Sequence, residues 1–311
     1  MPRKFFKASL HLRKSKRLVS RTTAWWSFLP FLTFCFWHFP FLLNAQGDRA
    51  SALLWKVEPP DKSAPSFLFG TIHLIPAQDF SFSRAADSAL SLTEKIFFEM
   101  DISDPALQLR VLKSMKLDSG LTLSSLYKPT EYKKIKKKLE KAGVPLDMFQ
   151  SFLPIMIQQN FLIKNVFGGD TRSYELFLLE KARQAGLQID GLETVDDQVK
   201  ALRAISLERQ ARMLKEGVLK PGRSRRQLLK LVRTYRRGDV EAMYRLTTRE
   251  KSMKEGVEAL LVERNRKWAE RLQSEMRQRP VFVAVGAAHL GGPEGLIALL
   301  RRQGFRLTPI P

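Results

Sequence analysis

Cysteine is almost absent from this chain. Of its 311 residues, only Cys35 is a cysteine, and it lies inside an N-terminal apolar run. The rest of the chain therefore has neither a disulfide nor a cysteine-ligated zinc or iron–sulfur site. Histidine is nearly as scarce, because His73 and His289 are the only histidines after residue 45.

Several common catalytic motifs are also missing. The chain contains no His-Glu-x-x-His, no Gly-x-Ser-x-Gly, no phosphate-binding loop and no Gly-x-Gly-x-x-Gly. These absences argue against the enzyme classes that carry those motifs. No strand pattern of aromatic and basic residues indicates an RNA-binding sheet, so no specific nucleic acid partner is predicted. The apolar content of 44% is ordinary and predicts a folded core.

Acidic residues are absent before Asp48, whereas eight lysines and arginines precede Thr22. The whole chain has 53 basic and 31 acidic residues, a net charge of +22, and without those eight it keeps 45 basic residues against 31 acidic ones. This excess predicts attraction to an anionic membrane surface or a polyanion. Basic helices are expected over residues 130–141 and 225–237, and each is either a solvated face or an anion-facing patch.

The first 45 residues have the pattern of an export signal. Basic residues occupy 3–21, an apolar and aromatic run covers 24–43, and a small, polar exit follows at 44–46. This is the order of a signal peptide. The apolar run of 20 residues is also long enough to span a bilayer. Residues 1–45 are thus predicted to be either a cleaved signal peptide or a retained N-terminal membrane anchor. Both readings export the remainder to a periplasmic or extracellular location.

One short motif, Gly-x-x-His, occurs twice, near the two ends of residues 46–311. Gly70 and His73 follow the apolar run 67–69, and Gly286 and His289 follow the apolar run 281–285. Each run is expected to be a buried strand, and the glycine permits a turn or a close approach where the strand ends. Sites in α/β folds form at the carboxyl ends of strands. The two Gly-x-x-His motifs are therefore predicted to form one site.

Two carboxylates accompany these histidines. Glu99 lies in an apolar stretch expected to be a central strand over 96–101, and Glu193 lies at the exit of another strand over 187–193. A buried acid is costly unless it is paired, hydrogen-bonded or metal-bound. Two histidines and one carboxylate suit Fe(II), Mn, Co or catalytic Zn, and a second carboxylate could serve as general base. The alternatives are a buried ion pair with an arginine for Glu99 and a loop or cap position for Glu193.

Strand patterns lie near both ends of residues 46–311, and helical patterns fill the middle. This order predicts an α/β fold with a central mixed sheet flanked by helices. A single domain is expected, with a large helical insert at about 105–278. Within the insert, one helix is expected over 195–219, ended by a break at Pro221 and Gly222.

A set of short segments resembles the TraB/PrgY/GumN family, which is related to the Tiki proteases. The segments are 54–57, 69–73, 98–101, 191–194, 263–265 and 285–290. They occur in order from about residue 52 to 310, which is the whole exported part. The resemblance implies an α/β fold with a helical insert and two Gly-x-x-His motifs that meet at one site.

The same resemblance assigns roles to residues. It implies His73, His289 and Glu99 as the site residues, with Glu193 nearby. We expect His73, His289 and Glu99 to be the metal ligands, Glu99 being third ligand or base, and Glu193 to be a further catalytic residue. Supporting positions are Gly70, Gly286, Arg264 and Asn265. Tiki-like members are metal-dependent peptidases that favour Mn or Co over Zn or Fe. An exported metal-dependent hydrolase acting on a peptide or protein is thus expected. The alternatives are a non-catalytic protein that sequesters a peptide or pheromone-like signal, and a polyanion-binding surface protein.

Overall fold

The computed structural model describes residues 52–61, 63–167, 170–249 and 255–311. The chain divides into two units, and the fold described below is that of the second, Asp48–Pro311. The predicted leader, residues 1–45, lies outside the described residues. Within the described ranges, no helix has both the length and the apolar character that crossing a membrane requires.

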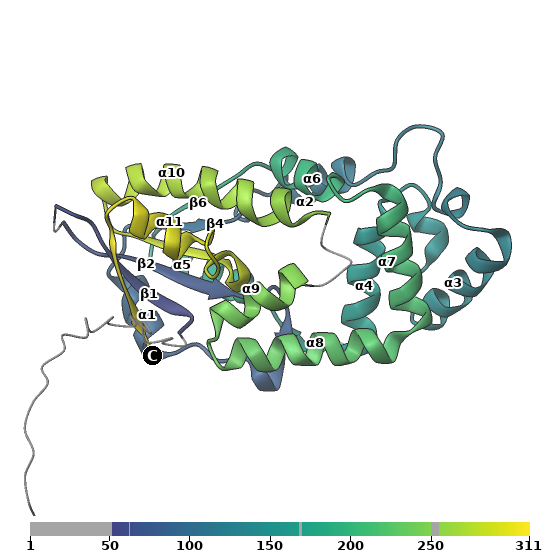
Figure 1. Cartoon of the computed structure of the whole chain (residues 1–311), viewed down its shortest axis with the longest axis horizontal. Helices are drawn as coiled ribbons and strands as arrows, with labels where there is room; N and C mark the ends of the chain where they lie inside the picture. Colours follow the sequence, from purple (N-terminus) through teal and green to yellow (C-terminus); the bar gives the residue numbers. More distant parts are fainter. Residues whose placement is uncertain (1–51, 62, 168–169, 250–254) are drawn as a thin grey trace, which may run out of the picture. The chain divides into compact units, whose positions relative to one another are not determined.

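A six-stranded sheet organises the second unit, with strand order β6-β4-β7-β2-β1-β8 (Figure 1). Its strands are β1 (Leu54–Glu58), β2 (Ser66–Thr71), β4 (Lys95–Phe98), β6 (Gln188–Gly191), β7 (Val281–Gly286) and β8 (Arg306–Ile310). The strands β6, β4, β7 and β2 run parallel to one another, whereas β1 is antiparallel to both β2 and β8. The predicted α/β fold with a central mixed sheet is confirmed.

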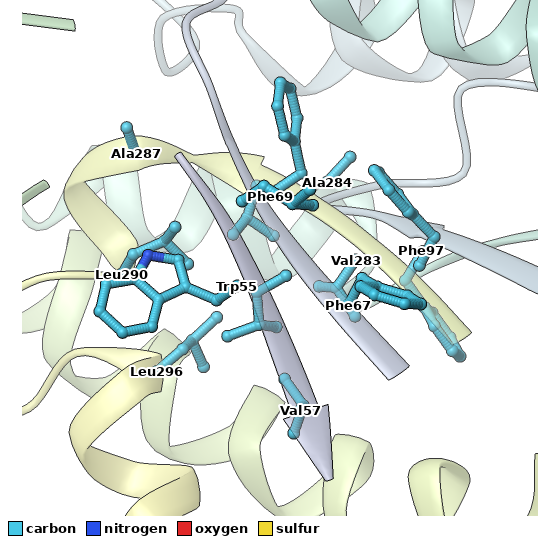
Figure 2. Close-up of a cluster of buried hydrophobic side chains, with 14 of the residues drawn as sticks. Trp55, Val57, Phe67, Phe69, Phe97, Val283, Ala284, Ala287, Leu290 and Leu296 are labelled. Carbon is cyan, nitrogen blue, oxygen red and sulfur yellow. The ribbon is translucent and has the colours of Figure 1, made fainter. Parts of the chain in front are cut away.

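The apolar sequence runs explain the centre of this sheet. Every residue of β4 is buried, and so are residues 281–285 of β7. A parallel strand covered on both faces needs a continuous apolar run, not an alternating one. Figure 2 shows the resulting core, in which Phe67 and Phe69 of β2 lie with Val283 and Ala284 of β7.

Helices pack against the sheet and also form a second apolar centre of their own. The helices outside that second centre are α1 (Arg84–Ser91), α2 (Leu107–Ser114), α5 (Tyr174–Gln184), α6 (Val195–Arg203), α8 (Pro221–Arg236), α9 (Val240–Arg249), α10 (Glu263–Gln278) and α11 (Leu296–Arg302). The remaining helices α3 (Pro129–Lys141), α4 (Pro154–Phe167) and α7 (Leu207–Leu219) enclose a cluster that includes Ile135, Leu139, Ile157 and Leu214. Figure 1 shows these three helices grouped together.

One local expectation was wrong and a neighbouring one was right. The single helix expected over 195–219 is two helices, α6 and α7, with Ile205 fully buried between them. The side chain of Gln210 donates to the Ile205 carbonyl at 3.0 Å, which satisfies a group that the break leaves open. The expected break at Pro221 is present, because α7 ends at Leu219 and Pro221 is the first residue of α8. Proline suits the first helical position because its missing N–H has no partner there.

A short two-stranded ladder ties distant parts of the chain together. In it, β3 (Ile75–Pro76) pairs with β5 (Thr171–Arg172) in antiparallel register. The ladder follows His73 by two residues and precedes α5 by two. It therefore brings the start of α5 to the first Gly-x-x-His motif.

Candidate functional site

The four predicted catalytic residues leave the carboxyl ends of the four parallel strands. His73 follows β2, Glu99 follows β4, Glu193 follows β6 and His289 follows β7. The strands are neighbours in the order β6-β4-β7-β2, so these exits share one edge of the sheet. Ligand sites of open α/β sheets form at this edge.

Both motif glycines allow close approaches. A Cβ placed on Gly70 would lie 3.0 Å from the Cβ of Ala287, inside the second motif. Figure 2 shows Ala287 and Leu290 on the segment that follows β7. At Gly286, the backbone N–H donates to Oε1 of Glu99 at 2.9 Å, and an added Cβ would lie 3.3 Å from that oxygen. The two motifs thus pack on each other and on Glu99.

Arg264 connects the two carboxylates. This buried arginine of α10 donates from Nη2 to Glu99 Oε2 at 2.7 Å and to Glu193 Oε1 at 2.7 Å. Its Nε donates to Glu193 Oε2 at 2.8 Å, so the contact with Glu193 is bidentate. The ion pair with an arginine, which was the alternative for Glu99, is therefore present, and it extends to Glu193.

His289 is held in one orientation and one tautomer. Its Nδ1 lies 2.6 Å from Oδ1 of Asn265, whose Nδ2 donates to the carbonyl of Glu294 at 2.8 Å. The Asn265 oxygen must accept, so His289 carries its proton on Nδ1. Its Nε2 is left as a lone pair, 3.4 Å from Arg264 Nη1 and 3.9 Å from Glu99 Oε1. The ring also packs on Trp268, with centroids 4.6 Å apart.

His73 has an equivalent support that the sequence did not reveal. Its Nδ1 lies 3.0 Å from Oε1 of Glu175, the second residue of α5. The same oxygen accepts from Thr71 Oγ1 at 2.8 Å, and the other accepts from Ser173 at 2.9 Å. With Nδ1 facing a carboxylate, Nε2 of His73 is available to a ligand, and 73% of the side chain is exposed.

The carboxylates of the network differ in their electrostatics. Burial opposes ionisation of Glu99, but the attraction of nearby positive charge, from His289 when protonated and from Arg264, holds its pKa well below the usual range. Burial lowers the pKa of His289 to about 3, so the positive charges that act on Glu99 at neutral pH are those of Arg264 and His73. Burial also raises the pKa of Glu193 in spite of Arg264. One guanidinium thus faces two carboxylates.

The pKa of His73 shifts in the opposite direction to that of His289. The hydrogen bond to Glu175 raises the pKa of His73 above its ordinary value. Burial would raise the pKa of Glu175, but the same contact with His73 outweighs it and lowers that pKa. Solvent screens the pair, because most of the His73 side chain is exposed.

The chemistry of the donors suits a divalent cation. His289 Nε2 and Glu99 Oε1 are 3.9 Å apart, a separation that two ligands of one ion, each about 2.1 Å from it, can have. Each motif histidine has Nδ1 engaged, as metal-bound histidines do, and an ion at Nε2 of His289 would replace the 3.4 Å contact with Arg264 Nη1. Within the described ranges, however, no three His, Cys, Asp or Glu side chains are already arranged around one cation position.

Two cavities flank Glu193. The larger, about 510 Å³, also has Asp101, Asp196 and Arg271 in its wall. The smaller, about 270 Å³, has Arg264 and Trp268 in its wall. Leu192, Glu193 and Asp197 line both, so two spaces for a ligand adjoin Glu193.

All residues of this network lie in a stretch of the chain that matches a protein family. The sequence profile of the TraB/PrgY/gumN family matches residues 53–309. The chain belongs to this family. Of the site residues expected by resemblance, Glu99, Glu193, Arg264, Asn265 and His289 join one hydrogen-bond network, whereas the hydrogen bond of His73 leads to Glu175.

Relatives of this chain are metalloproteases by name. The chain is 22% identical over 317 residues to metalloprotease TIKI2 of Danio rerio, and the match covers 84% of this chain and 61% of the relative. It is 20% identical to metalloprotease TIKI1 of Danio rerio (86% and 65% covered) and 21% identical to that of Homo sapiens (86% and 64%). The chain thus spans less than two thirds of these relatives. No solved structure gives a significant match.

Proposed function

We propose that this protein is a metal-dependent hydrolase and that its substrates are peptides or proteins. The observation that carries the proposal is the support that each motif histidine receives at Nδ1. In each, Nδ1 contacts an acceptor, Asn265 or Glu175, so Nε2 is the ring nitrogen left to bind an ion. The names of the relatives, all metalloproteases, agree with this chemistry.

The proposed ligands are His73, His289 and Glu99. A divalent ion, of which Mn or Co is preferred by the family resemblance, would supply Lewis acidity toward a carbonyl group. Glu193 is the proposed proton acceptor. Its pKa is raised, which makes its carboxylate a stronger base than an ordinary glutamate. Arg264 positions Glu193 and Glu99 through its hydrogen bonds at 2.7–2.8 Å.

The cavities beside Glu193 are the proposed place for the substrate. They provide about 510 and 270 Å³ of space, and Glu193 is in the wall of both. Export to the periplasm or the cell exterior, by the predicted signal or anchor, is part of this proposal. An anionic surface, membrane or polymer, is the second partner that we propose for the basic helices.

A second candidate function is non-catalytic sequestration of a peptide or pheromone-like signal. The position of Arg264 between Glu99 and Glu193 favours this function. The arginine neutralises the two carboxylates without a metal, so the site could bind a ligand and have no catalytic ion.

Metal content and peptide hydrolysis test the two candidates together. The purified chain is loaded with Mn or Co and incubated with a peptide library, and the variants His73→Gln, His289→Gln and Glu99→Gln are compared. The hydrolase proposal expects each variant to lose metal and at least 100-fold of activity. Glu58→Gln is the matched control, because Glu58 pairs with Lys56 and Arg306 on β1 and β8. Unchanged metal content and turnover in the site variants would refute the hydrolase; peptide binding without turnover would support sequestration.

A further inference from the structure

Two helices carry unusual positive charge. Six of the 13 residues of α3 are lysines, and α8 has six basic residues and no acidic residue among its 16. The exposed basic residues of α3 are Lys133, Lys134, Lys137, Lys138 and Lys141. Those of the first half of α8 are Arg223, Arg225 and Arg226.

The acids near α3 do not neutralise this face. Glu131 pairs with Lys215 of α7 at 2.5 Å, and Lys136 takes both Glu140 and Asp147, at 3.6 and 2.7 Å. In the part of the chain that the structure describes, no ion pair involves Lys133, Lys137 or Lys141. Their charges face solvent.

Helix stability does not account for the pattern. Lys133, Lys137 and Lys141 are spaced four residues apart, where like charges repel. Arg223, Arg225 and Arg226 lie in the first two turns of α8, where positive charge opposes the helix dipole. Except for Lys141 in the last turn of α3, these placements work against their own helices, so the charge needs another explanation.

The two basic segments are connected, and an apolar side chain lies beside them. Lys138 Nζ donates to the carbonyl of Leu219, the last residue of α7, and α8 begins two residues later. The turn Leu146–Phe149 contacts α3 through Asp147, and its Met148 is 73% exposed. Lysines next to an exposed apolar side chain are typical of surfaces that lie on a membrane interface.

We propose that α3, the turn 146–149 and the first half of α8 bind the surface of an anionic phospholipid bilayer. Lysines and arginines would contact the headgroups, and Met148 would enter the interface. A single-stranded nucleic acid fits less well, because no aromatic side chain of α3 or α8 is exposed for stacking on bases. The surface lies outside the metal site, so this inference does not rest on the hydrolase proposal.

Vesicle binding of the full chain tests the proposal. Co-sedimentation is measured with vesicles of phosphatidylglycerol and phosphatidylcholine, and with phosphatidylcholine alone. We expect binding to the anionic vesicles to weaken steeply from low to high salt. In the triple variant Lys133→Gln, Lys137→Gln, Lys141→Gln, we expect the affinity for anionic vesicles to fall about 100-fold, because each lysine contributes a factor of about five.

The control variant removes the same charge elsewhere. Arg84, Lys113 and Arg183 are exposed residues of α1, α2 and α5, and replacing all three by Gln should change binding less than about 3-fold. Every variant carries the same leader, so the difference reports the helices. Met148→Ser should weaken binding several-fold further.

Three results would overturn the proposal. They are equal effects of the two triple variants, equal binding to neutral vesicles, and binding to heparin or DNA without binding to anionic vesicles. Circular dichroism checks that the variants are folded. If the α3 triple variant is not folded, the single variants Lys133→Gln and Lys137→Gln replace it, and each should weaken binding about 5-fold.

Discussion

The Nδ1 atom of His289 lies 2.6 Å from Oδ1 of Asn265. Because the Asn265 amide donates to backbone carbonyls at 2.8 and 3.3 Å, its oxygen accepts, and the histidine proton stays on Nδ1. The available lone pair of Nε2 then faces Glu99 and Arg264. A residue adjacent to Arg264 thus decides what His289 can bind.

Asn265→Ala should lower the affinity for Mn or Co about 10- to 100-fold, since it removes the partner that orients a ligand. Chelator competition measures the affinity of the folded variant. Asn160→Ala is a matched control, because Asn160 is exposed on α4 and bonds only a local carbonyl. Equal affinities of the two variants would contradict the orienting role.

Glu175→Gln should lower the pKa of His73 toward its ordinary value of 6.5, because Glu175 is the main cause of its elevation. The ring-proton NMR signal of His73 measures this pKa in metal-free protein. Thr71→Val is the control, since it removes a second bond to Glu175 but leaves the contact at 3.0 Å with His73. An unchanged His73 titration in Glu175→Gln would show that the pair does not persist in solution.

Arg264→Gln should destabilise the metal-free fold by about 3–5 kcal/mol, because it leaves two buried carboxylates without their cation. Urea unfolding at neutral pH gives the change in free energy. Adding Glu193→Gln to this variant should restore part of the loss, since one buried charge then disappears. If the double variant is no more stable than the single one, the two residues are not coupled.

Gly70→Ala should destabilise the protein by about 1–3 kcal/mol, because the new methyl group would lie 3.0–3.1 Å from Ala287 and Leu290. Gly217→Ala in α7 is the control. Its Cβ would meet neighbours no closer than 3.7 Å, and alanine in a helix interior should stabilise by up to about 1 kcal/mol. Thermal unfolding compares the two, and similar shifts would contradict the close approach of the motifs.

Stability of the metal-free protein should fall on acidification because of His289. The unfolded ring takes a proton below its ordinary pKa of 6.5, whereas the folded ring resists down to about 3. The penalty grows by up to about 1.4 kcal/mol per pH unit, or about 2 kcal/mol at pH 5. His73 acts oppositely, since its raised pKa adds stability that is present below pH 6.5 and lost as pH rises through the folded value.

The variants separate these two effects in urea unfolding at pH 7 and pH 5. His289→Gln should flatten the loss of stability between the two values, and His73→Gln should steepen it. A parallel response of both variants would rule out opposite titration of the two histidines.

Much of the fold could be predicted from local sequence. The apolar runs before Gly70 and Gly286 form buried parallel neighbours, because a strand covered on both faces needs only short-range apolar residues to be recognised. Helix limits were less certain. The helical pattern over 195–219 is interrupted at Ile205, whose side chain packs in a buried apolar cluster. No local sequence pattern indicates this interruption.

The sequence by itself determined the residue types of the site. With no cysteine and only two histidines after residue 45, these histidines and the carboxylates at strand ends were the available donors. Tertiary structure alone decided their partners. Arg264 meets Glu99 across 165 residues of chain, and Glu175 meets His73 across 102. Periodicity reports contacts within one element only, whereas these pairs depend on how the parallel sheet and the β3–β5 ladder bring separate elements to one edge.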